Sequence, residues 1–141
     1  MAATSSSWKR LEAPAEREDL KLQMLFTDSD AEAMMQGFIP KEMEDKWFIY
    51  FEAGWLWFHR SWTGTAIYAL RLDGSQAGVR VVESWVNRNP EQYKQRDTEF
   101  DRKLVIYLID NILLRKSVPF PTPPGAEKGP PGLVRHHYVG R

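Results

Sequence analysis

Two aromatic runs, 47–51 and 55–59, lie close together near the middle of the chain. Three residues separate them, and the last is Gly54, which predicts a β-hairpin with Gly54 at a turn position of positive φ. Because side chains alternate between the faces of a strand, Trp57 and His59 share one face of the second run. Both faces are apolar, so this hairpin is expected to be central and covered on at least one side.

Two more strand-like segments follow the hairpin, 65–72 and 79–86, and a turn-rich connection over 73–78 joins them. The four runs with short links predict an antiparallel meander. The earlier segment 20–26 fits either a strand or a short helix.

A short helix is expected over 31–36. Asp28 or Asp30 would cap its N-terminus, and Gly37 would end it. A longer amphipathic helix is predicted between 100 and 115, where apolar residues recur at helical spacing.

We expect this longer helix to start within 87–93, because Asn89 suits the N-cap and Pro90 the first helical position. Asp97 would restart or bend it. The predicted fold class is α+β: a four- or five-stranded, mostly antiparallel sheet (meander) with a C-terminal amphipathic helix packed on one face.

The chain has 141 residues, which is room for one domain. Residues 1–19 are small and charged and are expected to form a flexible lead-in. Residues 20–116 are expected to form the single α+β domain. Residues 117–141 begin with a proline-rich stretch and are predicted to form an extended tail, with its order left open.

Composition excludes several classes of function. With 19 basic and 19 acidic residues, the chain has no excess positive charge for a nucleic-acid partner. The absence of cysteine excludes disulfides and thiolate chemistry. No apolar run approaches the ~20 residues that cross a bilayer, and the N-terminus has no apolar core of a secretory signal. We therefore expect a cytoplasmic protein that binds no membrane.

No cofactor motif is found, and a metal site is not expected. The three histidines are His59, His136 and His137, which lack the spacing of metal ligands.

The first candidate site is the polar cluster 59–64 that follows the second aromatic run. Arg60 is suited to gripping a carboxylate or phosphate with two hydrogen bonds. Ser61 and Thr63 would add hydrogen bonds, and Trp62 would stack on a base or sugar ring. The alternative stays open that Arg60 pairs locally, that Trp62 is core and that the hydroxyls satisfy a turn.

His59 is the candidate catalytic residue, because imidazole titrates near neutral pH. A neutral, partly buried imidazole is the more common outcome on a face shared with tryptophans. A triad would require Ser61 and a carboxylate such as Glu83 or Asp101 to converge on His59, and the chain has no nucleophile-elbow motif.

The second candidate cluster contains Arg88, Asn89 and Tyr93, at the expected helix start. A helix N-terminus attracts anions, and Tyr93 would supply a stacking ring. In a meander the second and fourth strands run the same way, so Arg60 and Arg88 are expected at one end of the sheet, where they would clamp one ligand. A capped helix with a surface arginine is the alternative.

The segments that carry both clusters resemble a small, largely uncharacterised bacterial family. Its motifs are W-F-x-Y-x-E, matched at 47–52; H-R-S-W-T-G, matched at 59–64; and V-N-R-x-P-E-Q-Y, matched at 86–93. The resemblance covers about residues 40–115. It implies that the two clusters form a paired signature, and it implies no activity.

Three hypotheses of function follow. The first is a binding domain for a small anionic, nucleotide-like or phosphorylated ligand at 59–64 and 87–93. The second is a small hydrolase of phosphoester or N-glycosidic bonds with His59 as acid and base. The third is a protein–protein interaction or immunity-type module, anchored by exposed aromatic residues.

Overall fold

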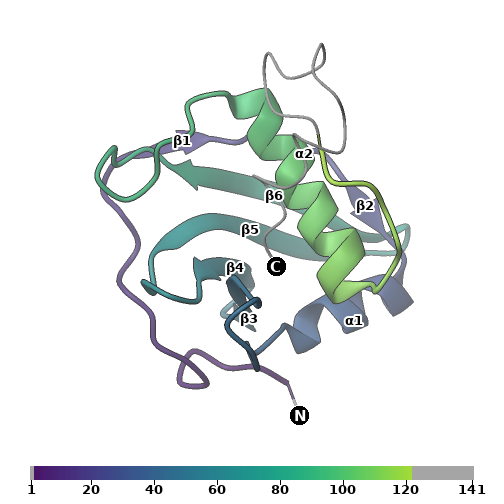
Figure 1. Cartoon of the computed structure of the whole chain (residues 1–141). Coiled ribbons are helices and arrows are strands. Elements are labelled where there is room, and N and C mark those ends of the chain that lie inside the picture. Colours follow the sequence, from purple (N-terminus) through teal and green to yellow (C-terminus); the bar gives the residue numbers. More distant parts are fainter. Residues whose placement is uncertain (1, 122–141) are drawn as a thin grey trace.

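The computed structural model describes residues 2–121, which form one antiparallel sheet with helices on one face (Figure 1). The six strands are β1 (Arg17–Asp19), β2 (Leu25–Phe26), β3 (Trp47–Glu52), β4 (Trp55–Arg60), β5 (Ala66–Ser75) and β6 (Gly78–Asn87). The helices are α1 (Asp28–Gln36) and α2 (Thr98–Leu108), and α2 continues as the π-helical segment η1 (Ile109–Leu113). The strand order is β1-β6-β5-β4-β3, with β2 also paired to β6, so the predicted α+β class and its β3–β6 meander are confirmed.

The predicted aromatic hairpin is β3–β4, closed by a two-residue turn. Ala53 and Gly54 both have positive φ, 54° and 87°, which is the type I′ geometry that matches strand twist. In the register of the hairpin Tyr50 lies opposite Trp57, and their rings stack with centroids 6.2 Å apart. The expected face assignment of Trp57 and His59 is thus confirmed, because the rings of Tyr50 and His59 also stack.

The second hairpin is longer than the sequence indicated. β5 runs to Ser75 and β6 begins at Gly78, so the expected connection over 73–78 is mostly strand and only two residues turn. Asp73 lies opposite Arg80, and both are exposed, so the pairing of β5 with β6 continues through polar residues outside the core.

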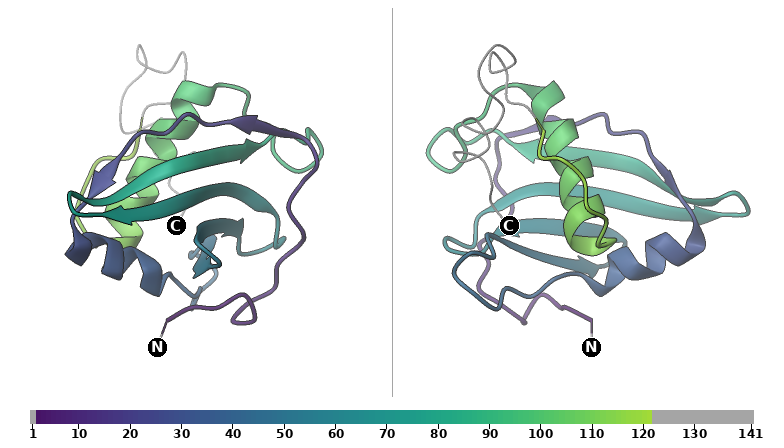
Figure 2. Two further views of the ribbon diagram at one scale, coloured as in Figure 1. Left: turned by 180° about the vertical axis from the view of Figure 1, so that it is seen from behind. Right: turned by 45° about the vertical axis from the view of Figure 1, so that its right-hand side comes forward.

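Part of the expected lead-in belongs to the sheet. Residues 17–19 form β1 and pair with the end of β6, while residues 25–26 form β2 and pair with its beginning. Between β1 and β2 the chain has no regular strand pairing but stays hydrogen-bonded to β6, since the Leu20 amide donates to the Ser84 carbonyl at 3.1 Å. β1 was missed because its three side chains are all exposed and give no apolar alternation. Figure 2 shows this segment following the outer edge of β6.

The helix starts differ from those expected. In α1 the cap is Thr27, whose Oγ1 accepts from the Asp30 amide, rather than Asp28 or Asp30; Gly37 ends the helix as predicted. α2 starts at Thr98, and its cap Asp97 accepts from the Phe100 amide.

The predicted helix start over 87–93 is wrong. Residues 90–92 form a turn, in which the amides of Gln92 and Tyr93 donate to the Asn89 carbonyl. The side chain of Gln92 accepts from Asn87 Nδ2 instead of closing a capping box on the backbone, so the helix is not nucleated here.

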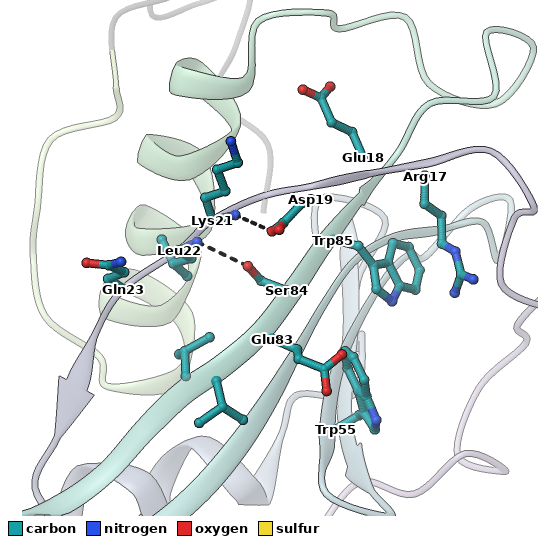
Figure 3. A pocket seen from close by; sticks show the side chains of 12 residues that line it. Arg17, Glu18, Asp19, Lys21, Leu22, Gln23, Trp55, Glu83, Ser84 and Trp85 are labelled. Carbon is teal, nitrogen blue, oxygen red and sulfur yellow. Dashed lines mark hydrogen bonds between the residues drawn. The ribbon is translucent and has the colours of Figure 1, made fainter.

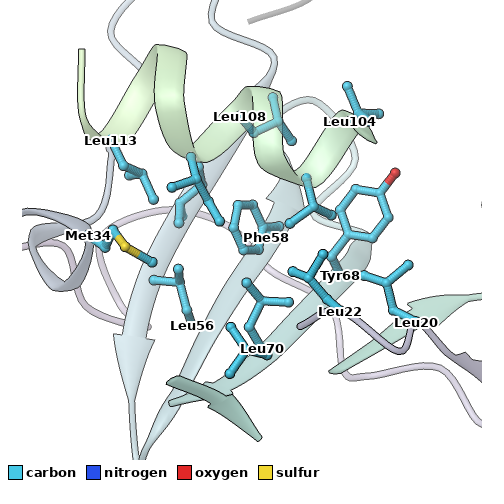
Figure 4. Packing of buried hydrophobic residues seen from close by; sticks show 14 of the residues in the cluster. Leu20, Leu22, Met34, Leu56, Phe58, Tyr68, Leu70, Leu104, Leu108 and Leu113 are labelled. Carbon is cyan, nitrogen blue, oxygen red and sulfur yellow. The ribbon is translucent and has the colours of Figure 1, made fainter. Parts of the chain in front are cut away.

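The main core lies between the sheet and the helices (Figure 4). The apolar stripe of α2 and η1 packs against side chains of β4 and β5 on one face of the sheet. We call the opposite face of the sheet the open face. The buried residues labelled in Figure 4 are Leu20, Leu22, Met34, Leu56, Phe58, Tyr68, Leu70, Leu104, Leu108 and Leu113.

The beginning of the predicted tail also packs on this core. Val118 and Phe120 contact it, and the ring of Phe120 lies 4.9 Å from that of Tyr107. The rest of the predicted tail, 122–141, lies outside the described residues. Within residues 2–121, no helix has the length and apolar character to span a membrane.

Candidate functional site

His59 lies on the open face of the sheet, but it is sealed from solvent. Its side chain is 1% exposed, and the rings of Phe48, Tyr50 and Trp57 surround it. Nδ1 lies 2.8 Å from the Gly64 carbonyl, to which it donates in the neutral tautomer. Burial lowers the pKa of His59, so the ring is neutral near pH 7.

Neither the Ser61 hydroxyl nor the carboxylates of Glu83 and Asp101 converge on His59. The Ser61 hydroxyl donates to the Asp45 carbonyl at 2.6 Å. Glu83 pairs with Arg71, and Asp101 lies on the helical side of the sheet. His59 Nε2 has no hydrogen-bond partner within the described chain. The geometry therefore offers no proton relay through this residue.

The loop after β4 uses its hydroxyls internally. Thr63 Oγ1 donates to Thr65 Oγ1 at 2.9 Å and accepts from the Thr65 amide. Gly64 has φ of 80°, and the Leu11 amide donates to its carbonyl, so the N-terminal segment is fastened onto this loop. The hydroxyls of Ser61 and Thr63 are thus hydrogen-bonded within the chain, which agrees with the alternative that they satisfy a turn.

Trp62, from the same loop, is presented to solvent. Its side chain is 56% exposed, and its Nε1 donates to the Met43 carbonyl at 3.1 Å. The Lys46 ammonium lies 3.7 Å from the ring centroid, a cation–π contact on one ring face. Trp8 is held in a similar way, since its Nε1 donates to the Ser61 carbonyl at 2.8 Å.

We call the area around these rings the Trp62 surface; it comprises Trp8, Lys9, Lys41, Met43 and Trp62. It lines a pocket of about 420 Å³, together with Glu42 and Ser61. Met43 is 73% exposed, so three large apolar side chains stand together at the surface.

Arg60 points to the helical side of the sheet. Its guanidinium carbon lies 5.0 Å from the Trp47 ring centroid, and burial lowers the pKa of Arg60. Tyr68 and Tyr93 are its polar neighbours and partly offset this effect. No hydrogen bond or ion pair of the Arg60 guanidinium occurs in the part of the chain that the structure describes.

Arg88, in contrast, donates hydrogen bonds from all three of its guanidinium nitrogens. It donates to Glu18 and to Asp101, each at 2.7 Å, and also to the Gln95 carbonyl and Thr98 Oγ1. Burial alone would lower the pKa of Arg88, but the bonds to the two carboxylates raise it. Arg88 is therefore not free to grip a ligand as predicted.

Tyr93 belongs to the same network. The hydroxyls of Tyr68 and Tyr93 both donate to Asp101 Oδ1 and lie 2.7 Å apart. Burial raises the pKa of both tyrosines, and the Asp101 charge raises them further. Tyr93 is thus a hydrogen-bonding residue, with its ring edge-on to that of Tyr68.

Asn89 shapes the loop before Tyr93. Its amide donates to Asn87 Oδ1, and its own Oδ1 accepts from the Glu91 amide at 2.9 Å. The structure therefore brings Arg60, Tyr93 and Arg88 to one end of the sheet, as the meander predicted, around the Tyr68–Asp101 pair. Ser61, Trp62 and Thr63 lie in the loop beyond β4, apart from that pair.

The central role of Asp101 was not apparent from the sequence. It is fully buried and sits on the apolar stripe of α2, three and four residues before Leu104 and Val105. An acidic residue on the apolar stripe of a helix could have indicated this role, because a buried carboxylate requires hydrogen-bonding or charged partners. Trp8 was missed because it lies within the expected lead-in.

A second pocket, of about 590 Å³, lies on the open face and is drawn in Figure 3. We call it the open-face groove and define it by Arg17, Asp19 and Lys21 of the N-terminal segment, Trp55 of β4, and Glu83 and Trp85 of β6. The Arg17 guanidinium carbon lies 5.3 Å from the Trp85 ring centroid.

No protein-family model, curated protein or solved structure matches this chain. The resemblance to a small bacterial family therefore stays a prediction. Within residues 2–121, no group of three or more histidine, aspartate or glutamate side chains is arranged to hold a metal ion.

Proposed function

We propose that this domain is a binding module for a polypeptide partner, and that the Trp62 surface receives an apolar side chain of that partner next to acidic groups. This is the protein–protein interaction hypothesis, with its anchors now assigned to Trp8, Met43 and Trp62.

The observation that carries the proposal is the exposure of a fixed Trp62. A tryptophan that is 56% exposed leaves apolar area in water, and its bond to the Met43 carbonyl holds that area in place. Rigid, exposed tryptophans contribute much of the binding energy at protein interfaces, because little conformational entropy is lost on docking.

The chemistry of the Trp62 surface favours a peptide side chain over a nucleobase. Both indole N–H groups and the Ser61 hydroxyl donate to backbone carbonyls, so few neutral donors remain to read a base edge. The ammonium groups of Lys9 and Lys41 have no ion pair within the described residues, whereas Glu42 is the one acid of the lining. A partner with acidic groups beside its apolar anchor would complement this arrangement.

Selection from a random peptide display library tests the proposal without a known partner. We expect wild type to enrich peptides with an aromatic or large aliphatic residue beside aspartate or glutamate. Trp62→Ala should then weaken the selected peptides by roughly 30-fold or more, the effect of losing a hot spot of about 2 kcal/mol.

Leu25→Ala is the matched control, because Leu25 is 54% exposed on β2 and lies outside the Trp62 surface. It should bind the selected peptides like wild type. Failure to enrich any peptide, or equal binding by wild type and Trp62→Ala, would refute the proposal.

A second candidate is binding of a small anion at Arg60, which retains the first hypothesis with one arginine instead of two. The specific observation is a guanidinium that lies over Trp47 without a hydrogen bond or ion pair in residues 2–121. The test is a thermal-shift screen of nucleotides, ADP-ribose, NAD, sugar phosphates and simple anions.

A ligand at 100-fold its Kd should stabilise wild type by roughly 2.7 kcal/mol. Arg60→Gln should lose this stabilisation, while Arg80→Gln, an exposed arginine on β6, should keep it. A shift retained in Arg60→Gln would exclude Arg60 as the anion site.

A further inference from the structure

The open face carries a row of tryptophans around a small residue. Ala69 of β5 lies opposite Trp57 on one side and Trp85 on the other. The two indoles meet edge to face over this position, with ring centroids 6.0 Å apart, and Trp55 lies 6.1 Å from Trp57. Trp55 and Trp85 thereby form aromatic walls of the open-face groove (Figure 3).

These indoles differ from those of the Trp62 surface in their hydrogen bonding. Trp8 and Trp62 donate to backbone carbonyls, whereas the N–H groups of Trp55 and Trp85 make no hydrogen bond within the described residues. Neither N–H is a buried unpaired group, since only His59 Nε2 has that character in residues 2–121. Both N–H groups are therefore unpaired and not fully buried within the described residues.

Carboxylates of the groove retain acceptor capacity. Glu83 accepts from Arg71 through Oε1 at 2.6 Å, and Asp19 accepts from the Lys21 amide through Oδ1 at 2.8 Å. The second oxygen of each carboxylate has no partner in the described structure. Figure 3 draws the Glu83 side chain at the groove together with those of Trp55 and Trp85.

Charge in the groove is nearly balanced. Its lining contains Arg17 and Lys21 against Glu18, Asp19 and Glu83, of which Glu18 is paired with Arg88 and Glu83 with Arg71. A strongly charged ligand would gain little at such a lining, because the basic and acidic side chains together would both attract and repel it. The groove thus favours a neutral ligand that both donates and accepts hydrogen bonds.

We propose that the open-face groove binds a neutral saccharide. A sugar ring presents a face of C–H groups that packs on an indole, and its hydroxyls accept from the indole N–H groups and donate to the Glu83 and Asp19 carboxylates. The volume of about 590 Å³ lies within the range of small-ligand sites, roughly 300–1,000 Å³. This inference is independent of the Trp62 surface, which uses different residues.

The test uses the whole chain and a panel of methyl glucoside, methyl galactoside, N-acetylglucosamine, maltose, cellobiose and lactose. Indole N–H resonances in ¹H–¹⁵N NMR spectra, assigned with single Trp→Phe variants, report on each tryptophan. At least one sugar should shift the Trp55 and Trp85 resonances to saturation at concentrations up to about 50 mM, enough to detect millimolar Kd values. The Trp62 resonance serves as the internal control and should not move.

Four variants then test the assignment. Trp55→Ala should weaken binding at least tenfold, and Glu83→Gln several-fold, while Glu52→Gln, an exposed acid at the end of β3, should bind like wild type. Trp55→Phe keeps a ring at the site and should bind more tightly than Trp55→Ala if the latter remains folded. The proposal is overturned if no sugar shifts Trp55 and Trp85, or if Trp55→Ala and Trp55→Phe bind as wild type does.

Discussion

Arg88 ties the end of β6 to the first turn of α2, because its Nη2 donates to Asp101 Oδ2 at 2.7 Å. Asp101 is fully buried, and Tyr68 and Tyr93 donate to its other oxygen. A single carboxylate thus joins β5, β6, the loop after β6 and the helix, and orients α2 on the sheet.

Replacing Asp101 should destabilise the domain strongly. Asp101→Asn removes the charge that pairs with Arg88 and keeps one acceptor oxygen, which cannot serve both Arg88 and the two tyrosines, so we expect a loss of about 3 kcal/mol in the free energy of unfolding. Glu18→Gln is the matched control, since Glu18 also pairs with Arg88 but its side chain is half exposed; its loss should stay below about 1 kcal/mol. Urea titrations measure both, and similar losses would contradict the central role of Asp101.

Stability should fall on acidification, and His59 should contribute to the fall. Burial holds the folded pKa of His59 below the unfolded value, which is about 6.5. Below about pH 6.5 the unfolded chain therefore binds the extra proton, and stability is lost by up to roughly 1.4 kcal/mol per pH unit. His59→Asn keeps a donor for the Gly64 carbonyl without titrating, so its urea midpoint should depend less on pH between 7.5 and 5.5. An unchanged pH dependence would contradict this.

Gly37 should be irreplaceable. Its φ of 70° and ψ of −163° fall in a region that is accessible essentially to glycine alone, and a Cβ there would meet the Ile49 carbonyl oxygen. We expect Gly37→Ala to cost about 3 kcal/mol. In Gly54→Ala the alanine must also adopt a positive φ, but its Cβ would meet nothing within 4 Å, so the cost should be near 1 kcal/mol. Thermal or urea unfolding would separate the two, and equal costs would contradict the steric argument.

The β3–β4 turn offers a stabilising change. Ala53 has φ of 54°, which asparagine tolerates better than alanine in a type I′ turn. Ala53→Asn should raise the free energy of unfolding by roughly 0.5–1 kcal/mol. Ala77→Asn, in the other hairpin turn where φ is not positive, should leave stability within about 0.5 kcal/mol of wild type.

The meander and the α2 stripe were predictable because both depend on local patterns. Alternation and a short turn define β3–β4, and helical periodicity defines the stripe that reaches Leu108. β1 was not predictable, because its pairing with β6 depends on backbone groups across nearly seventy residues and its side chains carry no apolar pattern.

The candidate sites were predictable in position but less so in role. Meander topology brought Arg60 and Arg88 to one end of the sheet, as expected. The pattern could not show that Glu18 and Asp101 engage Arg88 while Arg60 has no ion pair within residues 2–121, because these contacts depend on how β1 and α2 pack against the end of β6. The sequence pointed to Trp62 as a stacking ring, and its exposure became visible only in the folded chain.

The break between β1 and β2 also bears on how this domain behaves at high concentration. A long, regular outer strand would offer a continuous row of amides and carbonyls to a neighbouring molecule. Here that border consists of segments of three and two residues, with Leu20 and Leu22 turned inward between them. Because the outer strand is interrupted, a strand of a second molecule finds few consecutive backbone groups with which to pair. The interruption therefore protects this edge of the sheet against edge-to-edge aggregation.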